Sequence, residues 1–566
     1  MAYFALPDAP RIGARGLALS HSQIAVHEDP LFLRARDRHP DRRVGLVSGG
    51  GSGHEPLHVG LLGQGGLDAV APGEMSASPH AGQITAASLA AATTGEVLHI
   101  VKNYAGDRVN FASAARQLQD EHVTVGTVVV DDDLATAGAA SGPGRRGTAA
   151  TLIVEKLLGA AADQGAGLTE LVELGAQIVS QSRSLAVTAR AYTSPTTLRP
   201  AFDLGREYDY GSGIHGERAA RRINSLRPTQ YIVRRMLADL LESVSPGPEG
   251  VILLVSGLGG TAELELRGIS ALAYDDLTDR GITVAAIAAG TYVSARDTAG
   301  ISLTLTALRP GWLSLWTAPA QTPLQLPGAV SQQPPATTSS ARPQASPTVL
   351  QPGRRDALEQ LARLTREVHP VLTRLDQKAG DGDFGDNWAG GVERALQDAR
   401  THGTAGTAAL ATAFSSVGGT SGPLFGLLFT RLAQALGNEH QDQVDIAALA
   451  TASADALDAI RETGGADVGD RTLLDALAPA SDALASAADG RREAALTAAA
   501  LAAIRGADTT ATLPGRQGRA SYVGDHALGI PDPGAVAIAL IYTVIAQTYE
   551  PQHSRQIPDI TTITAS

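Results

Sequence analysis

The sequence predicts two folding units, an α/β half followed by an all-helical half. The chain has 566 residues, whereas single hydrophobic cores stop growing at roughly 250 to 300 residues. Before Pro319, short β-branched segments alternate with helical ones, which is typical of α/β architecture. After Gly353, strand signals almost vanish and apolar residues recur at helical spacing. We therefore expect an α/β unit over 1–318 and a helical unit over 354–566.

The bulk composition narrows the class of partner. Hydrophobic residues make up 43% of the chain, charged residues 18% and aromatic residues 4%, as in globular proteins rich in close-packed helices. A formal net charge of −13 argues against nucleic acid or an anionic membrane as partner, because both require a basic face. The absence of cysteine excludes disulfides and thiolate chemistry and favours a cytoplasmic location. The longest apolar stretch, 536–546, is about half of the roughly 20 residues that a membrane-spanning helix needs.

The first half contains six segments that we expect to form strands. They are 44–47, 97–101, 123–130, 251–255, 282–288 and 301–306. Prolines and turn residues interrupt the pattern around 193–206, so this half is expected to consist of two α/β lobes. Segment 319–353 holds eight prolines and one charged residue, Arg342, and we interpret it as a flexible Pro-rich linker.

The second half opens with an apolar stripe at helical spacing. Its members are Leu358, Leu361, Leu364, Val368, Leu372 and Leu375. Pro370 is expected to kink this helix, because it cannot donate the backbone hydrogen bond of its position.

A glycine-rich acidic turn follows that helix. Its glycines allow Asp376, Asp381 and Asp383 to converge on one point, and converging carboxylates repel one another unless a cation lies between them. Oxygen ligands without Cys or His favour magnesium, calcium or manganese. The spacing does not fit an EF-hand, and no Glu closes a twelve-residue loop. A solvated acidic turn is the alternative for this segment taken alone.

Three more turns in the helical half carry glycine together with hydroxyl or carboxylate groups. Segment 418–426 opens a helix, where backbone N–H groups and two hydroxyls can hold phosphate, although it lacks the lysine of a P-loop. Segments 469–475 and 532–534 also lie at expected helix starts. Four such turns suggest one shared rim, whereas any one of them alone would be interpreted as a simple connection.

Three loops of the α/β half indicate a second site. Segment 47–56 follows a strand, and its glycines bring backbone N–H groups close to a small ligand, with His54 beside them. Segment 102–107 places Asp107 at the carboxyl end of a strand, where α/β sheets bind ligands. Segment 211–217 holds His215 between glycines. A turn or a structural histidine would explain each loop alone, but three in one half favour a site.

Taken together, these motifs resemble those of the dihydroxyacetone kinase family over roughly residues 40 to 550. The helical half carries Asp376 with Gly-Asp-Gly-Asp (380–383), Gly-Gly-Thr-Ser-Gly (418–422), Gly-Asp-Arg-Thr (469–472), Gly-Arg-Ala-Ser-Tyr (518–522) and Asp-Pro-Gly-Ala (532–535). The α/β half carries Gly-Ser-Gly-His-Glu-Pro (51–56), Lys-Asn-Tyr-Ala-Gly-Asp (102–107), Arg-Arg-Gly (145–147) and Gly-Ile-His-Gly-Glu (213–217).

The resemblance implies an eight-helix barrel whose rim holds two magnesium ions and ATP. It assigns the metal ions to Asp376, Asp381 and Asp383. It assigns nucleotide contacts to Asp383, Phe384, Gly385, Asp386, Thr420, Ser421, Gly464, Arg471, Thr472, Asp532, Pro533 and Gly534. The family usually has His-Gly-Thr where this chain has Phe384-Gly385-Asp386, so side-chain contacts there are not carried over.

The resemblance also implies a mechanism for a small ketose. His215 would add to the ketone carbonyl and form a hemiaminal, which selects ketoses over polyols. His54 would hydrogen-bond the substrate, and Asp107 would accept the proton of the attacking hydroxyl. Substrate contacts are assigned to Gly51, Ser52, Gly53, His54, Lys102 and Asp107. By analogy, the fusion of both halves implies ATP rather than a phosphocarrier protein as donor, and a homodimer.

Three alternatives stay open at this point. Ser76 stands where the family usually has phenylalanine, and Ser212 where it usually has a bulkier residue, so the substrate could be a four-carbon ketose such as erythrulose. Some relatives also cleave FAD to a cyclic flavin phosphate with manganese. A non-enzymatic ligand-sensing regulator is the third alternative, although this chain keeps His54, Asp107 and His215 and all three aspartates of the acidic turn.

Overall fold

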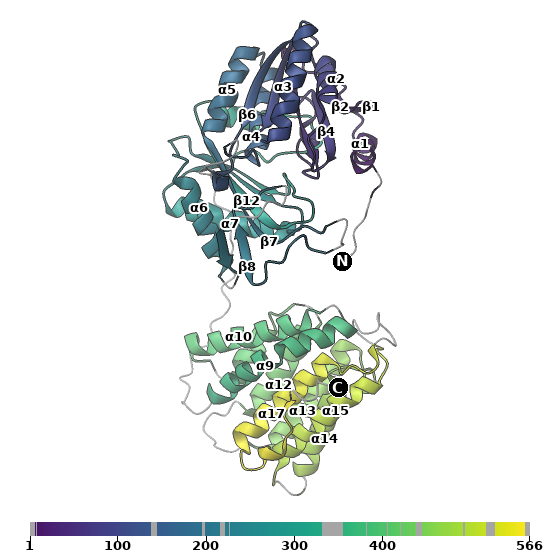
Figure 1. The fold of residues 1–566 in the computed structure, drawn as a ribbon. Helices are drawn as coiled ribbons and strands as arrows, with labels where there is room; N and C mark the ends of the chain where they lie inside the picture. Colours follow the sequence, from purple (N-terminus) through teal and green to yellow (C-terminus); the bar gives the residue numbers. More distant parts are fainter. Residues whose placement is uncertain are drawn as a thin grey trace. The chain divides into compact units, whose positions relative to one another are not determined.

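The computed structural model shows two compact units, divided between Ala336 and Thr337 (Figure 1). It describes residues 6, 8–136, 144–194, 199–214, 221–225, 227–330, 355–380, 382–404, 406–418, 420–436, 444–488, 490, 493–516 and 527–560. The first unit contains two sheets with helices, and the described part of the second is all helical. The predicted fold class is therefore confirmed.

The first sheet has the strand order β1-β2-β4-β3-β5-β6. Its strands are β1 (Ile24–Glu28), β2 (Leu31–Ala35), β3 (Gly45–Ser52), β4 (Ala69–Met75), β5 (Glu96–Lys102) and β6 (Thr124–Val130). β3 pairs in parallel with β4 and β5, and β5 pairs in parallel with β6. The carboxyl ends of these four strands therefore lie at one edge, where α/β sheets bind ligands. The helices around this sheet are α1 (Ala9–Ser20), α2 (Ala81–Ala91), α3 (Ala105–Asp120), α4 (Ala150–Asp163) and α5 (Leu168–Ser180), with short 3₁₀ turns η1 (Val59–Leu61) and η2 (Leu134–Thr136).

The second sheet has the order β11-β10-β12-β7-β8-β9 and is mostly antiparallel. Its strands are β7 (Ser182–Arg190), β8 (Glu207–Tyr210), β9 (Arg221–Asn224), β10 (Val251–Gly257), β11 (Val284–Gly290) and β12 (Ala299–Ala307). Its helices are α6 (Thr229–Leu241) and α7 (Glu263–Asp279), while the short helix α8 (Trp312–Thr317) packs against α4. The six predicted strands correspond to β3, β5, β6, β10, β11 and β12. The two lobes exist, but the lobe boundary predicted at 193–206 is placed too late, because β7 already belongs to the second sheet.

The two lobes are packed together within this unit. Helix α4 contacts β5 and β6 of the first sheet and β7 of the second, and it is buried from Ala150 to Ala162. The loop after β3 also crosses to the second lobe, where the N–H of Leu57 donates to the carbonyl of Tyr292 over 3.2 Å. A ligand at the end of β3 would therefore lie beside residues of both lobes.

The start of the predicted linker differs from the structure. The backbone N–H groups of Gln321, Leu324 and Val330 donate to carbonyls of the first unit over 2.9, 2.8 and 2.9 Å. The indole of Trp316 also donates to the carbonyl of Pro327 over 3.0 Å. The first unit therefore continues at least to Val330 instead of ending at residue 318.

The helical unit is a closed ring of helices. Its described helices are α9 (Arg355–Ala379), α10 (Phe384–His402), α11 (Gly406–Phe414), α12 (Ser421–Leu436), α13 (Ile446–Gly464), α14 (Leu474–Ala488), α15 (Ala495–Thr509) and α17 (Pro533–Tyr549), with 3₁₀ turns η4 (Thr510–Thr512) and η6 (Ser554–Gln556). Each helix packs against the next, and α17 packs back against α9. These eight described helices match the expected eight-helix barrel.

The apolar stripe of α9 faces the barrel core as expected. Leu358, Leu361, Val368, Leu372 and Leu375 are all buried. The helix continues through Pro370, where we expected a kink.

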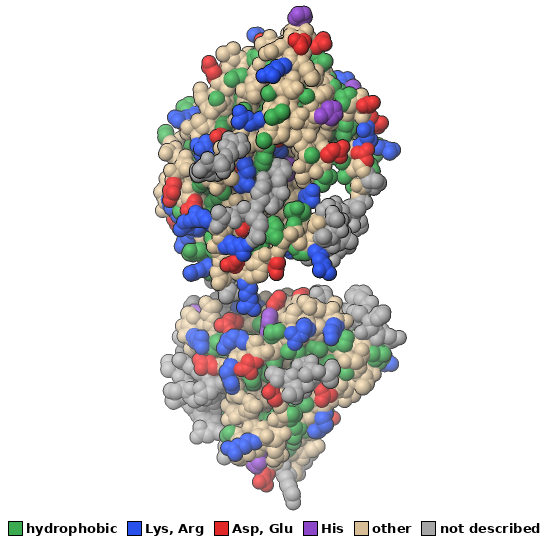
Figure 2. Space-filling model, in the orientation of Figure 1, with side chains coloured by type: hydrophobic (Ala, Val, Ile, Leu, Met, Phe, Trp, Pro, Cys, Tyr) green, Lys and Arg blue, Asp and Glu red, His purple; other side chains and the backbone are tan. Residues whose placement is uncertain are grey.

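The surface carries charges of both signs. On the face shown in Figure 2, Lys and Arg side chains are interspersed with Asp and Glu on each unit and do not gather in one broad basic patch. Among the described helices, none is both long enough and apolar enough to cross a membrane.

Candidate active site

The loop after β3 brings its backbone close to several buried polar groups. An added Cβ at Gly50 would lie 2.7 Å from Nζ of Lys102, and one at Gly51 would lie 2.8 Å from the backbone nitrogen of Ala77. Gly53 has a φ of 105°, a left-handed conformation that favours glycine. The glycine run predicted to approach a ligand is therefore required by the local packing as well.

His54 lies at the end of this loop and is only 2% exposed. Its Nδ1 is 2.8 Å from the carbonyl oxygen of Ser294 in the second lobe. A carbonyl can only accept, so Nδ1 carries the proton in this bond. The hydroxyl of Ser294 donates to the carbonyl of Gly53 over 3.0 Å, and the N–H of Arg296 donates to the same carbonyl over 3.1 Å. The second lobe thus fixes the orientation of the His54 ring.

Lys102 and Asp107 lie at the carboxyl end of β5 and in the first turn of α3. Lys102 is fully buried and Asp107 is 2% exposed. Within the described parts of the chain, Nζ of Lys102 and Oδ1 of Asp107 have no hydrogen-bond partner. Burial lowers the pKa of Lys102, while Asp107 and Glu155 act to raise it. Buried polar atoms normally have partners, so these two groups are poised to bind a small polar ligand.

The two residues that suggested a larger substrate lie in different environments. Ser212 is buried, and its hydroxyl is 2.7 Å from that of Thr188 on β7. Ser76 is exposed and accepts a hydrogen bond from the guanidinium of Arg296 over 3.0 Å. His215, the predicted hemiaminal residue, lies outside the described residues, which reach Ile214 on this loop.

The four glycine-containing turns of the helical unit lie at one end of the barrel. They connect α9 to α10, α11 to α12, α13 to α14 and α15 to α17. In an antiparallel ring, alternate connections lie at the same end. Contacts between turns agree: the guanidinium of Arg471 donates to the carbonyl of Ile530 over 2.8 Å, and an added Cβ at Gly534 would lie 3.4 Å from Cβ of Leu473.

Two of the three predicted metal ligands lie in the described part of the first turn. Asp376 lies in the last turn of α9, and its Oδ2 accepts the N–H of Phe384 over 3.0 Å. Asp383 is exposed at the N-cap of α10. Asp381 lies outside the described residues, and in the described part of the chain no three His, Cys, Asp or Glu side chains form a group that could hold a metal ion.

In the third and fourth turns, Asp475 and Asp532 face a single buried arginine, Arg471. Burial raises the pKa of Asp532 to about 6, and Asp475 and Asp376 act in the same direction, whereas Arg471 opposes them. Arg471 is 1% exposed, and its Nε and Nη1 have no partner among the described residues. Carboxylates from three turns therefore lie within electrostatic reach of one another.

Two of these turns lead directly into the starts of helices α14 and α12. The carboxylate of Asp475 accepts the N–H groups of Gly469 and Thr472 over 2.6 and 2.8 Å, which fixes the turn before α14. Thr420 is exposed directly before α12, which begins at Ser421. The positive end of the α12 dipole therefore points at this rim.

Three predicted nucleotide residues have other contacts in the structure. The ring of Phe384 is buried and stacks on Trp388, with ring centres 6.4 Å apart. An added Cβ at Gly385 would clash with Thr373 of α9, so this glycine permits helix packing. The carboxylate of Asp386 pairs with His369 over 2.7 Å. Any nucleotide contact of Phe384 is therefore limited to its backbone. The remaining predicted residues lie on the rim: Gly464 is exposed at the end of α13, and Pro533 and Gly534 begin α17.

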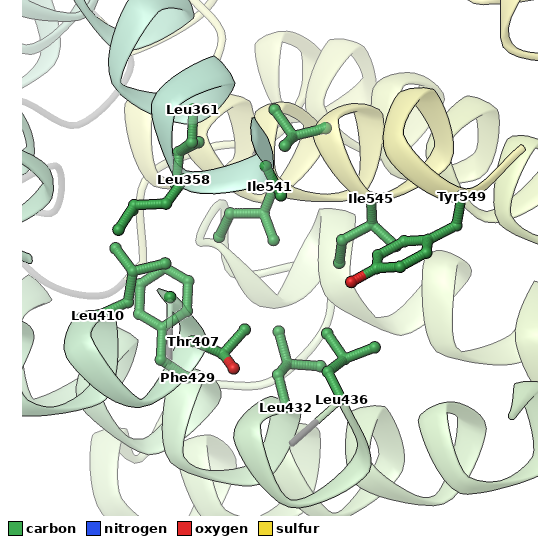
Figure 3. A pocket seen from close by; sticks show the side chains of 13 residues that line it. Leu358, Leu361, Thr407, Leu410, Phe429, Leu432, Leu436, Ile541, Ile545 and Tyr549 are labelled. Atoms are coloured by element: carbon green, nitrogen blue, oxygen red, sulfur yellow. The ribbon is translucent and has the colours of Figure 1, made fainter. Parts of the chain in front are cut away.

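An apolar cavity of about 80 Å³ lies at the other end of the barrel (Figure 3). Side chains from the start of α9 and α11 and from the end of α12 and α17 line it, among them Leu358, Leu410, Leu436 and Tyr549. The described residues that line it are uncharged, so they do not offer a site for a triphosphate.

Sequence reasoning missed two buried residues beside the substrate loop, His58 and Glu155. Glu155 is completely buried, and His58 is 4% exposed. A second histidine four residues after His54 was the available signal for His58. Glu155 lies in an apolar helical run and gives no local signal of a site.

Comparisons with known proteins agree with this architecture. The Dak1 domain family matches residues 15–324, and the DAK2 domain family matches residues 378–547. A Rattus norvegicus protein described as triokinase/FMN cyclase is 35% identical over 535 residues, which cover 90% of this chain and 91% of that protein. The L-erythrulose 1-kinase of Mycolicibacterium smegmatis is 32% identical, covering 94% of this chain and 96% of that protein.

A solved structure extends the similarity to the fold. The dihydroxyacetone kinase from C. freundii in complex with AMP-PNP and Mg²⁺ matches with a TM-score of 0.58 and 27% identity, covering 97% of this chain and 100% of that one. The fold and the two sites define a chain with a Dak1 unit and a DAK2 unit in one polypeptide. The chain belongs to the family of single-chain dihydroxyacetone kinases.

Proposed function

We propose that this chain is an ATP-dependent kinase that phosphorylates a terminal hydroxyl of a ketose with three or four carbons. The observation that carries the proposal is Asp107, whose buried carboxylate has an oxygen with no hydrogen-bond partner in the described structure. It lies in the first turn of α3, just after the carboxyl end of β5, and it acts to raise the pKa of buried Lys102. This placement suits a base that must stay ionised until it meets a hydroxyl proton.

The first unit binds and activates the ketose. Asp107 accepts the proton of the attacking hydroxyl, and Lys102 donates a hydrogen bond to a substrate oxygen. His54, whose ring is oriented by the bond between Nδ1 and the carbonyl of Ser294, hydrogen-bonds the substrate. His215 adds to the ketone carbonyl and fixes the substrate covalently, as the family resemblance implies. Gly51, Ser52 and Gly53 supply backbone groups to the same pocket.

The second unit binds the nucleotide on its rim. Thr420, Ser421, Thr472 and the α17 start at Asp532 contact the phosphates and the nucleoside, and Arg471 supports the turn that carries Thr472. Asp376, Asp381 and Asp383 hold magnesium, as two ions. When bound, magnesium neutralises charge on the phosphate oxygens, on which phosphoryl transfer depends. A relative of similar fold that was solved with AMP-PNP and Mg²⁺ supports this ligand set.

We assign ATP as donor because both units belong to one chain. The first 14 residues lie outside the matched domains, so no role in the reaction is assigned to them. The enzyme is proposed to act in the cytoplasm, where ATP and small ketoses are available, and as a homodimer. Light scattering of the purified chain measures the second point, and a mass of 58.1 kDa in solution would contradict it.

A substrate panel with ATP and magnesium tests the proposal. Dihydroxyacetone, D-erythrulose, L-erythrulose and glycerol are compared by kcat/KM in a coupled ADP assay. We expect at least one ketose to be phosphorylated and glycerol to be a poor substrate. The His215→Ala variant should lose the preference for ketose over glycerol. Turnover of no ketose by the wild-type chain would refute the function, and an unchanged ketose-to-glycerol ratio in His215→Ala would refute the hemiaminal role.

The choice between three and four carbons rests on Ser212. Its small side chain stands where the family usually has a bulkier residue, which favours the larger ketose. A kinase of L-erythrulose stands among the relatives that match nearly the whole chain. We expect kcat/KM to be higher for one erythrulose enantiomer than for dihydroxyacetone, and the reverse order would assign the chain to the three-carbon substrate.

A second activity is favoured by the triokinase/FMN cyclase relatives, which cover 90% of this chain. The rim that binds ATP would accept the diphosphate of FAD. Incubation of the purified chain with FAD and manganese, followed by chromatography, should release AMP and a cyclic flavin phosphate. Recovery of intact FAD after many hours would exclude this activity.

A further inference from the structure

A cluster of buried polar side chains lies behind the loop that follows β3. It consists of Ser48 on β3, His58 just before η1, Glu155 on α4 and Lys102 at the end of β5. Ser48, Glu155 and Lys102 are completely buried, and His58 is 4% exposed. Four polar side chains from four elements therefore meet in the interior of the first unit.

The hydrogen bonds of this cluster fix where the proton of His58 lies. The hydroxyl of Ser48 donates to the carbonyl of Ile100 over 2.8 Å, so its oxygen acts as acceptor toward Nδ1 of His58 at 2.9 Å. Nδ1 of His58 is also 2.5 Å from Oε1 of Glu155. With Glu155 as a carboxylate, both neighbours accept, and Nδ1 is then the protonated nitrogen. Nε2 of a neutral His58 then carries a lone pair directed away from Glu155.

The remaining polar atoms of the cluster lack partners in the described part of the chain. These atoms are Nε2 of His58, Oε2 of Glu155 and Nζ of Lys102. Nζ of Lys102 and Nε2 of His58 lie 2.7 and 3.4 Å from one point, the position of a Cβ added to Gly50. The imidazole acceptor and the ammonium donor are thus neighbours across the loop that is predicted to bind substrate.

Charge also links these residues. The groups that act on the Lys102 ammonium are Asp107 from α3, Glu155 from α4 and Glu55 from the loop after β3, with the imidazole of His58 beside them. All three carboxylates act to raise the pKa of Lys102 against the effect of burial. Asp107 faces the substrate and Glu55 lies on the loop, whereas Glu155 is the carboxylate fixed inside the protein.

We propose that Glu155 and His58 form a buried pair that positions Lys102. The carboxylate of Glu155 supplies the fixed counter-charge and holds His58 with Nδ1 protonated. Nε2 of His58 and Oε2 of Glu155 then accept hydrogen bonds from the Lys102 ammonium through a bridging water molecule. The other N–H groups of Lys102 stay directed at an oxygen of the bound ketose. Glu155 and His58 are positioning residues here, since they act on the substrate only through Lys102.

This inference rests on the proposed ketose kinase function, and the experiment separates the two. Profiles of kcat/KM against pH are measured with ATP, magnesium and the preferred ketose for wild type and Glu155→Gln. Loss of the fixed carboxylate should lower the pH at which Lys102 loses its proton. The alkaline limb should therefore move down by about 1 to 3 pH units, the range expected for removal of one close opposite charge. KM should rise about tenfold at pH 8, with a smaller fall in kcat.

Asp163→Asn is the matched control. Asp163 lies on the same helix and pairs with buried Arg42 over 2.5 Å, so the variant loses a buried ion pair without touching the cluster. It should lower Tm and leave the alkaline limb in place. Glu155→Asp should restore part of the shift. If Glu155→Gln does not fold, His58→Asn decides, because it keeps a donor toward Glu155 and removes the Nε2 acceptor, and its KM should rise.

Three outcomes would overturn the positioning role: an alkaline limb in Glu155→Gln that coincides with wild type, an equal shift in Asp163→Asn, or an unchanged KM in His58→Asn. Absence of ketose turnover in wild type would instead refute the proposed function and is recognised before any variant is measured.

Discussion

When magnesium and nucleotide are absent, the charged carboxylate of Asp532 should destabilise the helical unit at neutral pH. Asp532 is the N-cap of α17, where Oδ1 accepts the N–H of Ala535 over 2.8 Å. Burial raises its pKa from 3.8 to about 6, and Arg471 only partly offsets this. Asparagine caps a helix as well as aspartate does. Asp532→Asn should therefore keep the cap and remove the cost of a charge that is partly withdrawn from water.

The magnitude follows from linkage between protonation and folding. The folded pKa lies above the unfolded value, so the folded state binds more protons and wild-type stability falls as pH rises between about 4 and 6. With pKa values of 3.8 and about 6, the loss is roughly 0.5 kcal/mol at pH 4 and about 3 kcal/mol at pH 8, as an upper bound. Asp532→Asn lacks this term, so it should gain stability at pH 8 and little at pH 4.

Differential scanning calorimetry at pH 4 and pH 8, in buffer without magnesium, measures this difference. The transition of the helical unit is identified separately as the one that Mg-ATP moves. Asp445→Asn is the matched control, because Asp445 is an N-cap too, of α13, but an exposed one with a 3.0 Å bond to the N–H of Ala447. The reasoning is refuted if Asp532→Asn gains no stability at pH 8, or if Asp445→Asn gains as much.

Three further predictions concern the proposed base of the substrate site, a proposed metal ligand of the helical unit and a buried arginine of the first unit. Asp107→Asn should reduce kcat by about a hundredfold or more with KM nearly unchanged, as expected for removal of a general base, and steady-state kinetics with a near-normal kcat would contradict the assignment. Asp376→Asn should weaken Mg-dependent ATP binding at least tenfold in a calorimetric titration, whereas exposed Asp455→Asn on α13 should bind as wild type does. Arg42 is buried between the carboxylates of Asp68 and Asp163 at 2.9 and 2.5 Å, so Arg42→Met should cost about 3 to 5 kcal/mol of stability in urea unfolding; a cost below 1 kcal/mol would show that the carboxylates find other partners.

The central strands could be predicted from sequence, but strands that depend on a neighbour could not. β10 (Val-Ile-Leu-Leu-Val-Ser-Gly) is buried at every position and shows as an apolar run. β9 reads Arg-Arg-Ile-Asn and β8 reads Glu-Tyr-Asp-Tyr, and runs of four residues with one or two strand-favouring side chains are too short to predict a strand. They are extended because β8 pairs with β7 and β9 pairs with β8. β4 also escaped prediction, since it contains Pro72 and Gly73.

The sites divide in a similar way. Glycine spacing and short motifs predicted the loops that carry His54, Lys102 and Asp107, because a tight loop needs those residues locally. Glu155 reaches His58 across 97 positions of sequence, through the packing of α4 inside the unit. Such a contact depends on the tertiary fold and leaves no local pattern. Phe384 shows the opposite error, in which a residue close to a motif in sequence is assigned to the site. It follows the acidic turn, but its side chain lies on the core face of α10.

The ring order of the helical unit makes it a candidate for circular permutation. α9 begins and α17 ends beside the apolar cavity, which Leu358 and Tyr549 both line, and the two helices pack together. A short peptide could join these ends, and new termini could open the connection between α12 and α13, which lies at that same end. None of the four rim turns would be cut. A permuted helical unit could then be placed before or after the first unit in the chain. Activity of both arrangements would show that the reaction does not depend on the order of the two units in the sequence.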